Sequence, residues 1–188
     1  MSEETHLGLR LAALTLGAVI IQIAVVSQFT VFGVNADITP LVVGSAGLLT
    51  GPVAGSIVGF SMGLLIDMLL VQTLGVSALV YTLIGFGAGR LRELRAPQAT
   101  FTPLGLGAAA TAVATIGYSL LEFLLGVDAP VSFLLVRQIL ATIILNTLIS
   151  LPVYAGVRRW LRPALPEDPR RRRRRAYTTG GLSPLSRQ

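Results

Sequence analysis

The chain has 188 residues, of which 53% are hydrophobic and only 13% are charged, about half the charged fraction of a typical soluble domain. Uncharged runs of at least twenty residues cover 11–36, 38–66, 68–89, 96–121 and 138–157. About 20 apolar residues cross a hydrocarbon core of roughly 30 Å, and a soluble core of this size could not bury so many runs. The composition therefore excludes a soluble globular protein and predicts an integral membrane protein.

Residue types that carry catalysis or bind metals are scarce. The chain has no cysteine, so disulfides, thiolate metal sites and a cysteine nucleophile are excluded. The single histidine, His6, has no second ligand near it in the sequence. Neither a phosphate-binding loop nor a catalytic serine or zinc motif is present. We therefore predict no catalytic residue, no metal and no cofactor.

The hydropathy pattern and its turn residues predict six membrane helices, over residues 7–32, 38–50, 53–70, 76–94, 103–125 and 131–161. The second helix rises only about 20 Å, so it either crosses a thinned bilayer or is re-entrant. A single helix over 38–70 would rise about 50 Å, too long for a bilayer, and Gly51-Pro52 interrupts it. The predicted class is all-α, with a transmembrane domain over 1–162 and a disordered tail over 163–188.

Arginines collect after the fourth and the sixth predicted helices. These residues are Arg90, Arg92, Arg95, Arg158, Arg159, Arg162 and the run 170–175. Two helices separate the clusters, so both lie on one side of the membrane, which the positive-inside rule identifies as the cytoplasm. Six helices then place both termini in the cytoplasm. A five-helix alternative would place Arg10 outside and is disfavoured.

Glycines recur every four residues along the second and third predicted helices, and Ser77, Tyr81, Gly85 and Gly89 continue the pattern on the fourth. Glycines at this spacing allow the backbone of another helix to approach closely. The candidate residues are Gly55, Gly59, Gly63, Gly85 and Gly89. Two interpretations stay open: packing inside this bundle, or a groove for a partner's membrane helix.

Three ionisable residues, Asp67, Glu122 and Arg137, lie within predicted helices. Charges there are costly and usually face the bundle interior in pairs. The topology places all three in the outer half of the membrane, where Arg137 can pair with Glu122 or Asp67. A structural ion pair, a polar contact with a partner and a proton or substrate path are the alternatives. Asn146 lies deeper and is expected to hydrogen-bond across helices.

The C-terminal tail contains six consecutive arginines: Arg170, Arg171, Arg172, Arg173, Arg174 and Arg175. Its Pro, Gly, Ser and Thr content predicts disorder. Basic residues beside the membrane attract anionic lipid, so we expect an orientation signal and a lipid contact. Docking to an acidic cytoplasmic partner is the alternative. Nucleic-acid binding is not expected, because Tyr177 is the tail's one aromatic residue and no fold supports it.

The segment 40–92 resembles the rod shape-determining protein MreD family of bacterial inner membranes. The matching elements are Pro40, Gly51-Pro52, Gly55, Gly59-Phe60, Gly63, Asp67, Gly75, Ser77-Ala78, Tyr81, Gly85 and Gly89-Arg90. The segment 146–152 fits the family's last helix more loosely. Two features depart from the family: Leu41 follows Pro40 where an acidic residue is common, and the arginine-rich tail is not general.

This resemblance implies a non-enzymatic scaffold of the cell-elongation complex in the inner membrane. The implied partners are MreC and, through it, MreB, RodZ, RodA and a class B penicillin-binding protein, and no oligomeric state is implied. The family's fold is similar to the substrate-binding subunits of energy-coupling-factor vitamin transporters, which provides the alternative function. The short outer loops offer Asn35, Asp37, Gln72, Thr73 and Asp128, with little aromatic content. This favours the scaffold.

Overall fold

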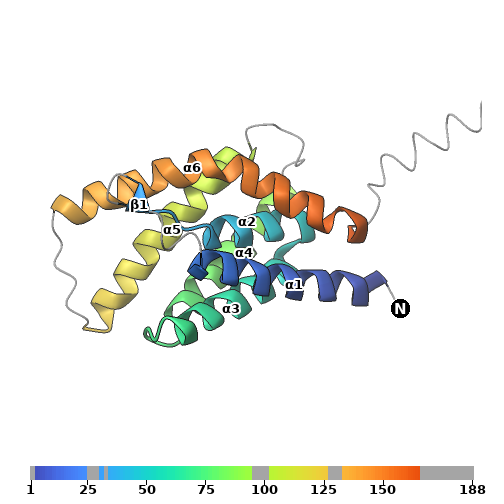
Figure 1. Cartoon of the computed structure of the whole chain (residues 1–188), viewed down its shortest axis with the longest axis horizontal. Coiled ribbons are helices and arrows are strands. Elements are labelled where there is room, and N and C mark those ends of the chain that lie inside the picture. The colour runs from blue at the N-terminus through green and yellow to red at the C-terminus, as the bar shows by residue number, and fades with distance from the viewer. Residues whose placement is uncertain (1–2, 25–29, 32–33, 95–101, 127–132, 166–188) are drawn as a thin grey trace, which may run out of the picture.

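The computed structural model describes residues 3–24, 30–31, 34–94, 102–126 and 133–165. Six α-helices form a bundle (Figure 1): α1 (Glu3–Ala24), α2 (Thr39–Thr50), α3 (Pro52–Leu69), α4 (Val76–Leu94), α5 (Thr102–Leu124) and α6 (Phe133–Leu161). Two-residue strands, β1 (Thr30–Val31) and β2 (Val34–Asn35), and a 3-10 turn, η2 (Arg162–Ala164), complete the described elements. The all-α class and the six predicted helices are confirmed.

The predicted end of the first helix is wrong. α1 ends at Ala24 rather than at residue 32, and β1 pairs antiparallel with β2, with Thr30 opposite Asn35. Thr30, Val31 and Val34 are β-branched, and such residues favour extended backbone over helix. The apolar composition of this stretch predicted a longer helix, but its β-branched residues form strands instead.

A single residue joins α2 to α3. Gly51 has φ 106°, a conformation that only glycine adopts without steric cost, and Pro52 occupies the first helical position, where its missing N–H is not needed. The Gly51 N–H still donates to the carbonyl of Gly47 at 2.8 Å. The predicted break at Gly51-Pro52 is confirmed as a sharp turn between two adjacent helices.

The short helix α2 lies at the centre of the bundle. All of its residues from Thr39 to Leu49 are buried, and it contacts each of the five other helices. Its 12 residues rise about 18 Å, less than a hydrocarbon core. Because the other helices surround α2, its ends need not reach the lipid headgroups. Non-helical backbone next to it is likewise buried in protein, where it can occur at membrane depth.

Four of the described helical segments are long and apolar enough to cross a membrane: Thr5–Ala24, Pro52–Leu69, Thr102–Leu124 and Val136–Ala164. α4 has 19 residues but carries Arg90, Arg92 and Glu93 near its C-terminus, so its last turn is suited to the membrane surface. Residues 166–188, with the six tail arginines, lie outside the described residues.

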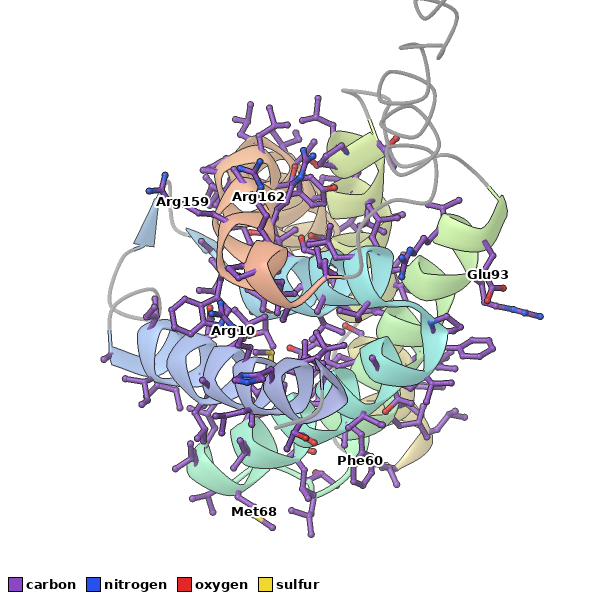
Figure 2. All side chains as sticks on the ribbon, turned by 90° about the vertical axis from the view of Figure 1, so that its right-hand side faces the viewer. Arg10, Phe60, Met68, Glu93, Arg159 and Arg162 are labelled. Atoms are coloured by element: carbon purple, nitrogen blue, oxygen red, sulfur yellow. The ribbon has the colours of Figure 1, made fainter. Side chains whose placement is uncertain are left out.

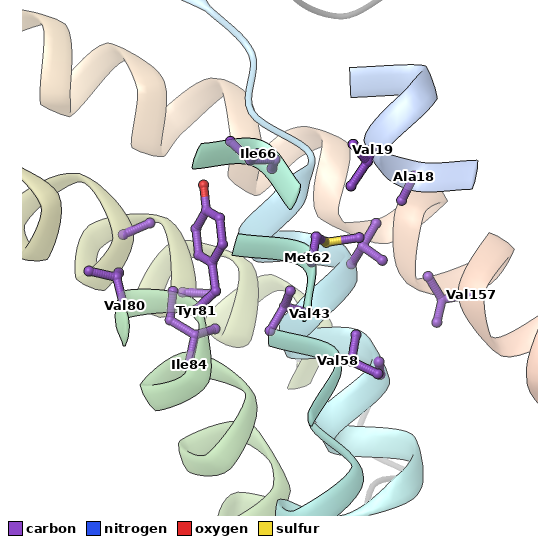
Figure 3. Packing of buried hydrophobic residues seen from close by; sticks show 14 of the residues in the cluster. Ala18, Val19, Val43, Val58, Met62, Ile66, Val80, Tyr81, Ile84 and Val157 are labelled. Atoms are coloured by element: carbon purple, nitrogen blue, oxygen red, sulfur yellow. The ribbon is translucent and has the colours of Figure 1, made fainter. Parts of the chain in front are cut away.

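One apolar cluster joins all six helices. Met62 of α3 lies among Ala18 and Val19 of α1, Val43 of α2 and Val157 of α6 (Figure 3), and it is fully buried. The ring of Tyr81 packs on the α4 side of the same cluster. The core is therefore continuous across the bundle, although about half of the described side chains of α1 and α6 are exposed.

Arg10 of α1 and Trp160 of α6 bind each other at one end of the bundle. The Arg10 guanidinium donates to the Trp160 carbonyl at 2.7 Å and lies 5.9 Å from the indole ring centroid, and the indole N–H donates back to the Arg10 carbonyl at 3.1 Å. Figure 2 faces this end, which also holds Arg159 and Arg162, while Phe60 points outward from α3. This contact holds the exposed helix α1 against α6.

Candidate functional site

The five predicted glycines lie in the contact between α3 and α4. A Cβ atom added at Gly55 would overlap the carbonyl of Gly85, and one at Gly85 would overlap the carbonyl of Gly55. The same test at Gly59 meets the carbonyl of Tyr81. At the two ends of the contact, a Cβ on Gly63 would meet the backbone of Ala78, and one on Gly89 would meet that of Pro52. The two helices therefore touch backbone to backbone from Pro52 to Gly63 on α3 and from Ala78 to Gly89 on α4.

This contact uses the glycine faces of both helices. Gly55, Gly59 and Gly63 are buried by α4, and Gly85 and Gly89 by α3. Because each stripe faces the other, neither offers an open groove to a partner helix. The opposite faces of the two helices expose large apolar side chains such as Ile57 and Phe60 on α3 and Leu83 on α4.

Asp67 closes the turn between α3 and α4. Its Oδ2 accepts from the N–H of Gly75 at 2.7 Å, and Gly75 has φ 96°, which a glycine accommodates. The Asp67 side chain is buried, and its Oδ1 has no hydrogen-bond partner within the described residues. Asp67 is therefore buried by the turn it stabilises.

No ion pair joins Asp67, Glu122 and Arg137. Within the described part of the chain, the salt bridge present is that between Arg90 and Glu93, at 2.9 Å. Arg137 is exposed near the start of α6, and Glu122 is half-buried beside Tyr118 on α5. Arg137 lies about one turn into its helix, where a long side chain can extend toward the membrane surface.

Two side chains from distant helices hold the segment that precedes α2. Gln22 of α1 accepts from the N–H of Ile38 at 3.0 Å and donates to the carbonyl of Ala36 at 3.4 Å. Asn146 of α6 accepts from the N–H of Asp37 at 3.2 Å and donates to the Asp37 carbonyl at 2.8 Å. Buried backbone groups at a helix start need such partners.

The Asn146 side chain also donates to the hydroxyl of Thr111 on α5 at 3.3 Å, and both side chains are fully buried. The predicted hydrogen bonding of Asn146 across helices is confirmed.

Asp37 is the acidic residue of this segment. Its carboxylate accepts from the N–H of Thr39 at 2.9 Å and from the hydroxyl of Tyr81 at 3.2 Å. Burial raises the pKa of the Asp37 carboxyl above its ordinary value, although both hydrogen bonds act in the opposite direction. Asp37 therefore links the start of α2 to the middle of α4.

A pocket of about 340 Å³ opens beside Asp37 and is lined by residues of all six helices. We call it the polar pocket. Its lining residues are Gln22, Asp37, Thr39, Ile66, Leu70, Gln72, Ser77, Val80, Tyr81, Ala114, Thr115, Tyr118, Ser119, Gln138, Ile139 and Thr142. Thr39, Ser77 and Tyr81 are buried at its floor, whereas Gln72 and Gln138 are exposed at its rim.

All parts of the polar pocket come from one end of the bundle. They lie near the C-terminal ends of α1, α3 and α5 and near the N-terminal ends of α2, α4 and α6. In alternating helices these ends face the same side. That side is opposite to the end at which Arg10 meets Trp160. The pocket volume lies at the lower end of the usual range for small-molecule sites.

The sequence reasoning missed this pocket because it looked for ligand-binding groups in the outer loops. Asp37 and Gln72 lie between the helices, whereas Tyr81 and Tyr118 lie on α4 and α5. The signal was present: uncharged polar residues, among them Gln22 and Gln138, recur at the same end of successive helices. The helical side chains supply the aromatic groups that the loops lack.

A family model described as rod shape-determining protein MreD matches residues 5–162 of the chain. The matched region includes nearly all of α1 and extends to Arg162, the first residue of η2. Neither a curated protein nor a solved structure matches the chain.

Proposed function

Because the chain belongs to the rod shape-determining protein MreD family, we propose that it is a non-enzymatic membrane scaffold. In this role it binds an MreC-type protein and helps to position peptidoglycan synthesis, so that the cell grows as a rod. The single observation that carries the proposal is the family match over 158 of the 188 residues (5–162). The wider elongation complex, with MreB, RodZ, RodA and a class B penicillin-binding protein, supplies the further partners.

For location and orientation, we propose the bacterial inner membrane with both termini in the cytoplasm. Arg10, Arg158, Arg159 and Arg162 belong to the same end of the bundle. Basic residues favour the cytoplasmic side, and the tail arginines 170–175 follow that end in the sequence and are proposed to bind anionic lipid. The polar pocket would then open toward the outside.

The backbone contact between α3 and α4 constrains where a partner can bind. The stripe from Gly55 to Gly63 packs against α4, so a partner's membrane helix has to use an outward face of the bundle. The substitution Gly59→Leu would disrupt this protein before it tested partner binding. Variants for partner mapping therefore belong on outward positions such as Phe60, which is 53% exposed.

The test is complementation with a binding assay. A rod-shaped bacterium depleted of its own MreD-family protein receives this chain together with its MreC-type partner. We expect rod shape to return and the MreC-type protein to co-purify with the tagged chain from detergent extracts. A folded, membrane-inserted chain that neither restores rods nor retains the MreC-type protein would refute the scaffold role.

The polar pocket favours one second candidate, the substrate-binding subunit of an energy-coupling-factor-type vitamin transporter. Such a subunit needs an outward-facing pocket with polar and aromatic contacts, and Asp37, Tyr81 and Tyr118 offer these groups. Co-purification with a coupling membrane subunit and its ATPases, together with ATP-dependent vitamin uptake, would support this candidate. Capture of the MreC-type protein without those subunits would reject it.

A further inference from the structure

The polar pocket combines a buried polar floor with apolar walls. Ser77 and Tyr81 lie at the floor, with exposed fractions of 3% and 8%, and Val80 and Ala114 form buried apolar parts of the wall. The Tyr81 hydroxyl already bonds to Asp37, but leaving the Ser77 hydroxyl unbonded against a cavity is costly. A ligand or water with matching polar groups would relieve that cost.

Several polar side chains of the pocket are available to a ligand. Within the described residues, the side chains of Ser77, Ser119, Gln72 and Gln138 make no hydrogen bond to the protein. Together they offer two hydroxyls and two amides. Each of these groups both donates and accepts hydrogen bonds. A ligand with hydroxyl and amide groups can therefore both donate hydrogen bonds to the pocket and accept them from it.

The charged residues of the pocket lining indicate whether a ligand should be anionic, cationic or uncharged. No arginine and no histidine line the pocket within the described part of the chain, and Asp37 is its acidic residue. An anion would therefore enter beside a carboxylate with no opposing cation. Asp37 already accepts hydrogen bonds from Thr39 and Tyr81, and burial raises the pKa of its carboxyl. Its attraction for a cation is correspondingly weak.

We propose that the polar pocket binds a small uncharged molecule that carries several hydroxyl or amide groups, of the size of a monosaccharide. The pocket's 340 Å³ corresponds to roughly ten water molecules at about 30 Å³ each, enough for one such ring. The rings of Tyr81 and Tyr118 provide apolar surfaces for the carbon skeleton, and the glutamines at the rim bond to its polar groups. This inference does not depend on the scaffold role.

Three monosaccharides that differ in charge test the proposal. Saturation-transfer NMR on the full chain, purified in detergent, compares N-acetylglucosamine (uncharged), glucosamine (cationic) and glucuronate (anionic) at millimolar concentration. We expect the strongest transfer to N-acetylglucosamine. No transfer to it would overturn the proposal, and stronger transfer to glucosamine or glucuronate would overturn the uncharged class.

Two matched pairs of variants locate the binding. Ser119→Phe places a ring in the pocket, whereas Leu120→Phe places one on the exposed side of the same helix. The first should abolish transfer and the second should preserve it. Tyr118→Phe removes one pocket hydroxyl and should weaken binding up to about tenfold, the effect of one hydrogen bond. Tyr154→Phe, outside the pocket, should have no effect.

Each variant is first checked for an unchanged melting temperature, and Tyr118→Phe supplies the result if Ser119→Phe does not fold. Equal transfer in all folded variants would show that the sugar binds elsewhere and would overturn the assignment. Loss of the MreC-type partner without loss of sugar binding would reject the scaffold role alone, so the two proposals can fail separately.

Discussion

At the residue scale, two side-chain amides inside the bundle bond to the short stretch of backbone that precedes α2. Asn146 illustrates this, because its amide satisfies both the N–H and the carbonyl of Asp37. Gln22 does the same for Ile38 and Ala36. In a membrane core such backbone groups cannot hydrogen-bond to water, so each side-chain amide supplies the hydrogen bonds that water would otherwise make.

Removing the Asn146 side chain should therefore destabilise the fold. Asn146→Ala leaves the N–H and carbonyl of Asp37 and the Thr111 hydroxyl without this partner, at a cost of about 1–3 kcal/mol for each buried group left unpaired. We expect a clearly lower melting temperature in detergent. Thr147→Ala is the control, because Thr147 bonds to a carbonyl of its own helix; an equal loss in both variants would contradict the prediction.

Asp67 is expected to stabilise the turn as a hydrogen-bond acceptor. Asp67→Asn keeps an oxygen for the N–H of Gly75 and should leave the melting temperature unchanged or raise it. Asp67→Ala loses that bond and should lower stability by about 1–3 kcal/mol. Thermal melting of the two variants decides this, and a loss in Asp67→Asn as large as in Asp67→Ala would show that the charge itself is needed.

At the element scale, the pair α3 and α4 is the tightest contact of the bundle. Its closeness depends on glycines that face each other across the interface, such as Gly55 and Gly85. Without a hydrophobic driving force between helices in lipid, close van der Waals packing is a main source of association. The exposed helix α1 packs against this pair through α3.

Two neighbouring glycines of α4 test this contact. Gly85→Ala places a methyl group against the backbone carbonyl of Gly55, whereas Gly87→Ala meets no atom within 4 Å. Overpacking costs about 1–3 kcal/mol, so the first variant should melt at a lower temperature and reach the membrane in smaller amounts. Gly87→Ala should behave as the parent. Equal melting temperatures and equal amounts of the two variants in the membrane would mean that α3 and α4 can move apart without loss of stability.

At the scale of the whole molecule, the two ends of the bundle differ in chemistry. One end carries the arginines and the contact between Arg10 and Trp160. The other contains the polar pocket and the exposed turn between α3 and α4, with Gln72 and Leu74. This difference is what the proposed orientation requires, since the basic end would face the cytoplasm.

The absence of cysteine makes that orientation directly measurable. Single cysteines at Leu74, which is 62% exposed, and at Glu93 are labelled in intact cells with a maleimide that does not cross the inner membrane. We expect Leu74→Cys to react and Glu93→Cys to react only after lysis. The parent chain, which cannot be labelled, sets the background, and the reverse pattern would invert the proposed topology.

The sequence by itself determined the membrane class, the number of helices and most of their limits. These features depend on local properties of the sequence. The length of each apolar run and the turn residues between the runs, such as Gly51-Pro52, can be read directly along the chain. The end of α1 was missed because apolar β-branched residues near Thr30 fit either a helix or a strand.

Only the tertiary structure decided what the helices face. It paired the glycine stripes of α3 and α4 with each other, placed α2 at the centre, and assembled the polar pocket from all six helices and the segment before α2. It also separated Arg137 from the carboxylates with which it was expected to pair. Periodicity shows which residues share one face of a helix, but the helix that covers that face is set by contacts between segments far apart in the chain.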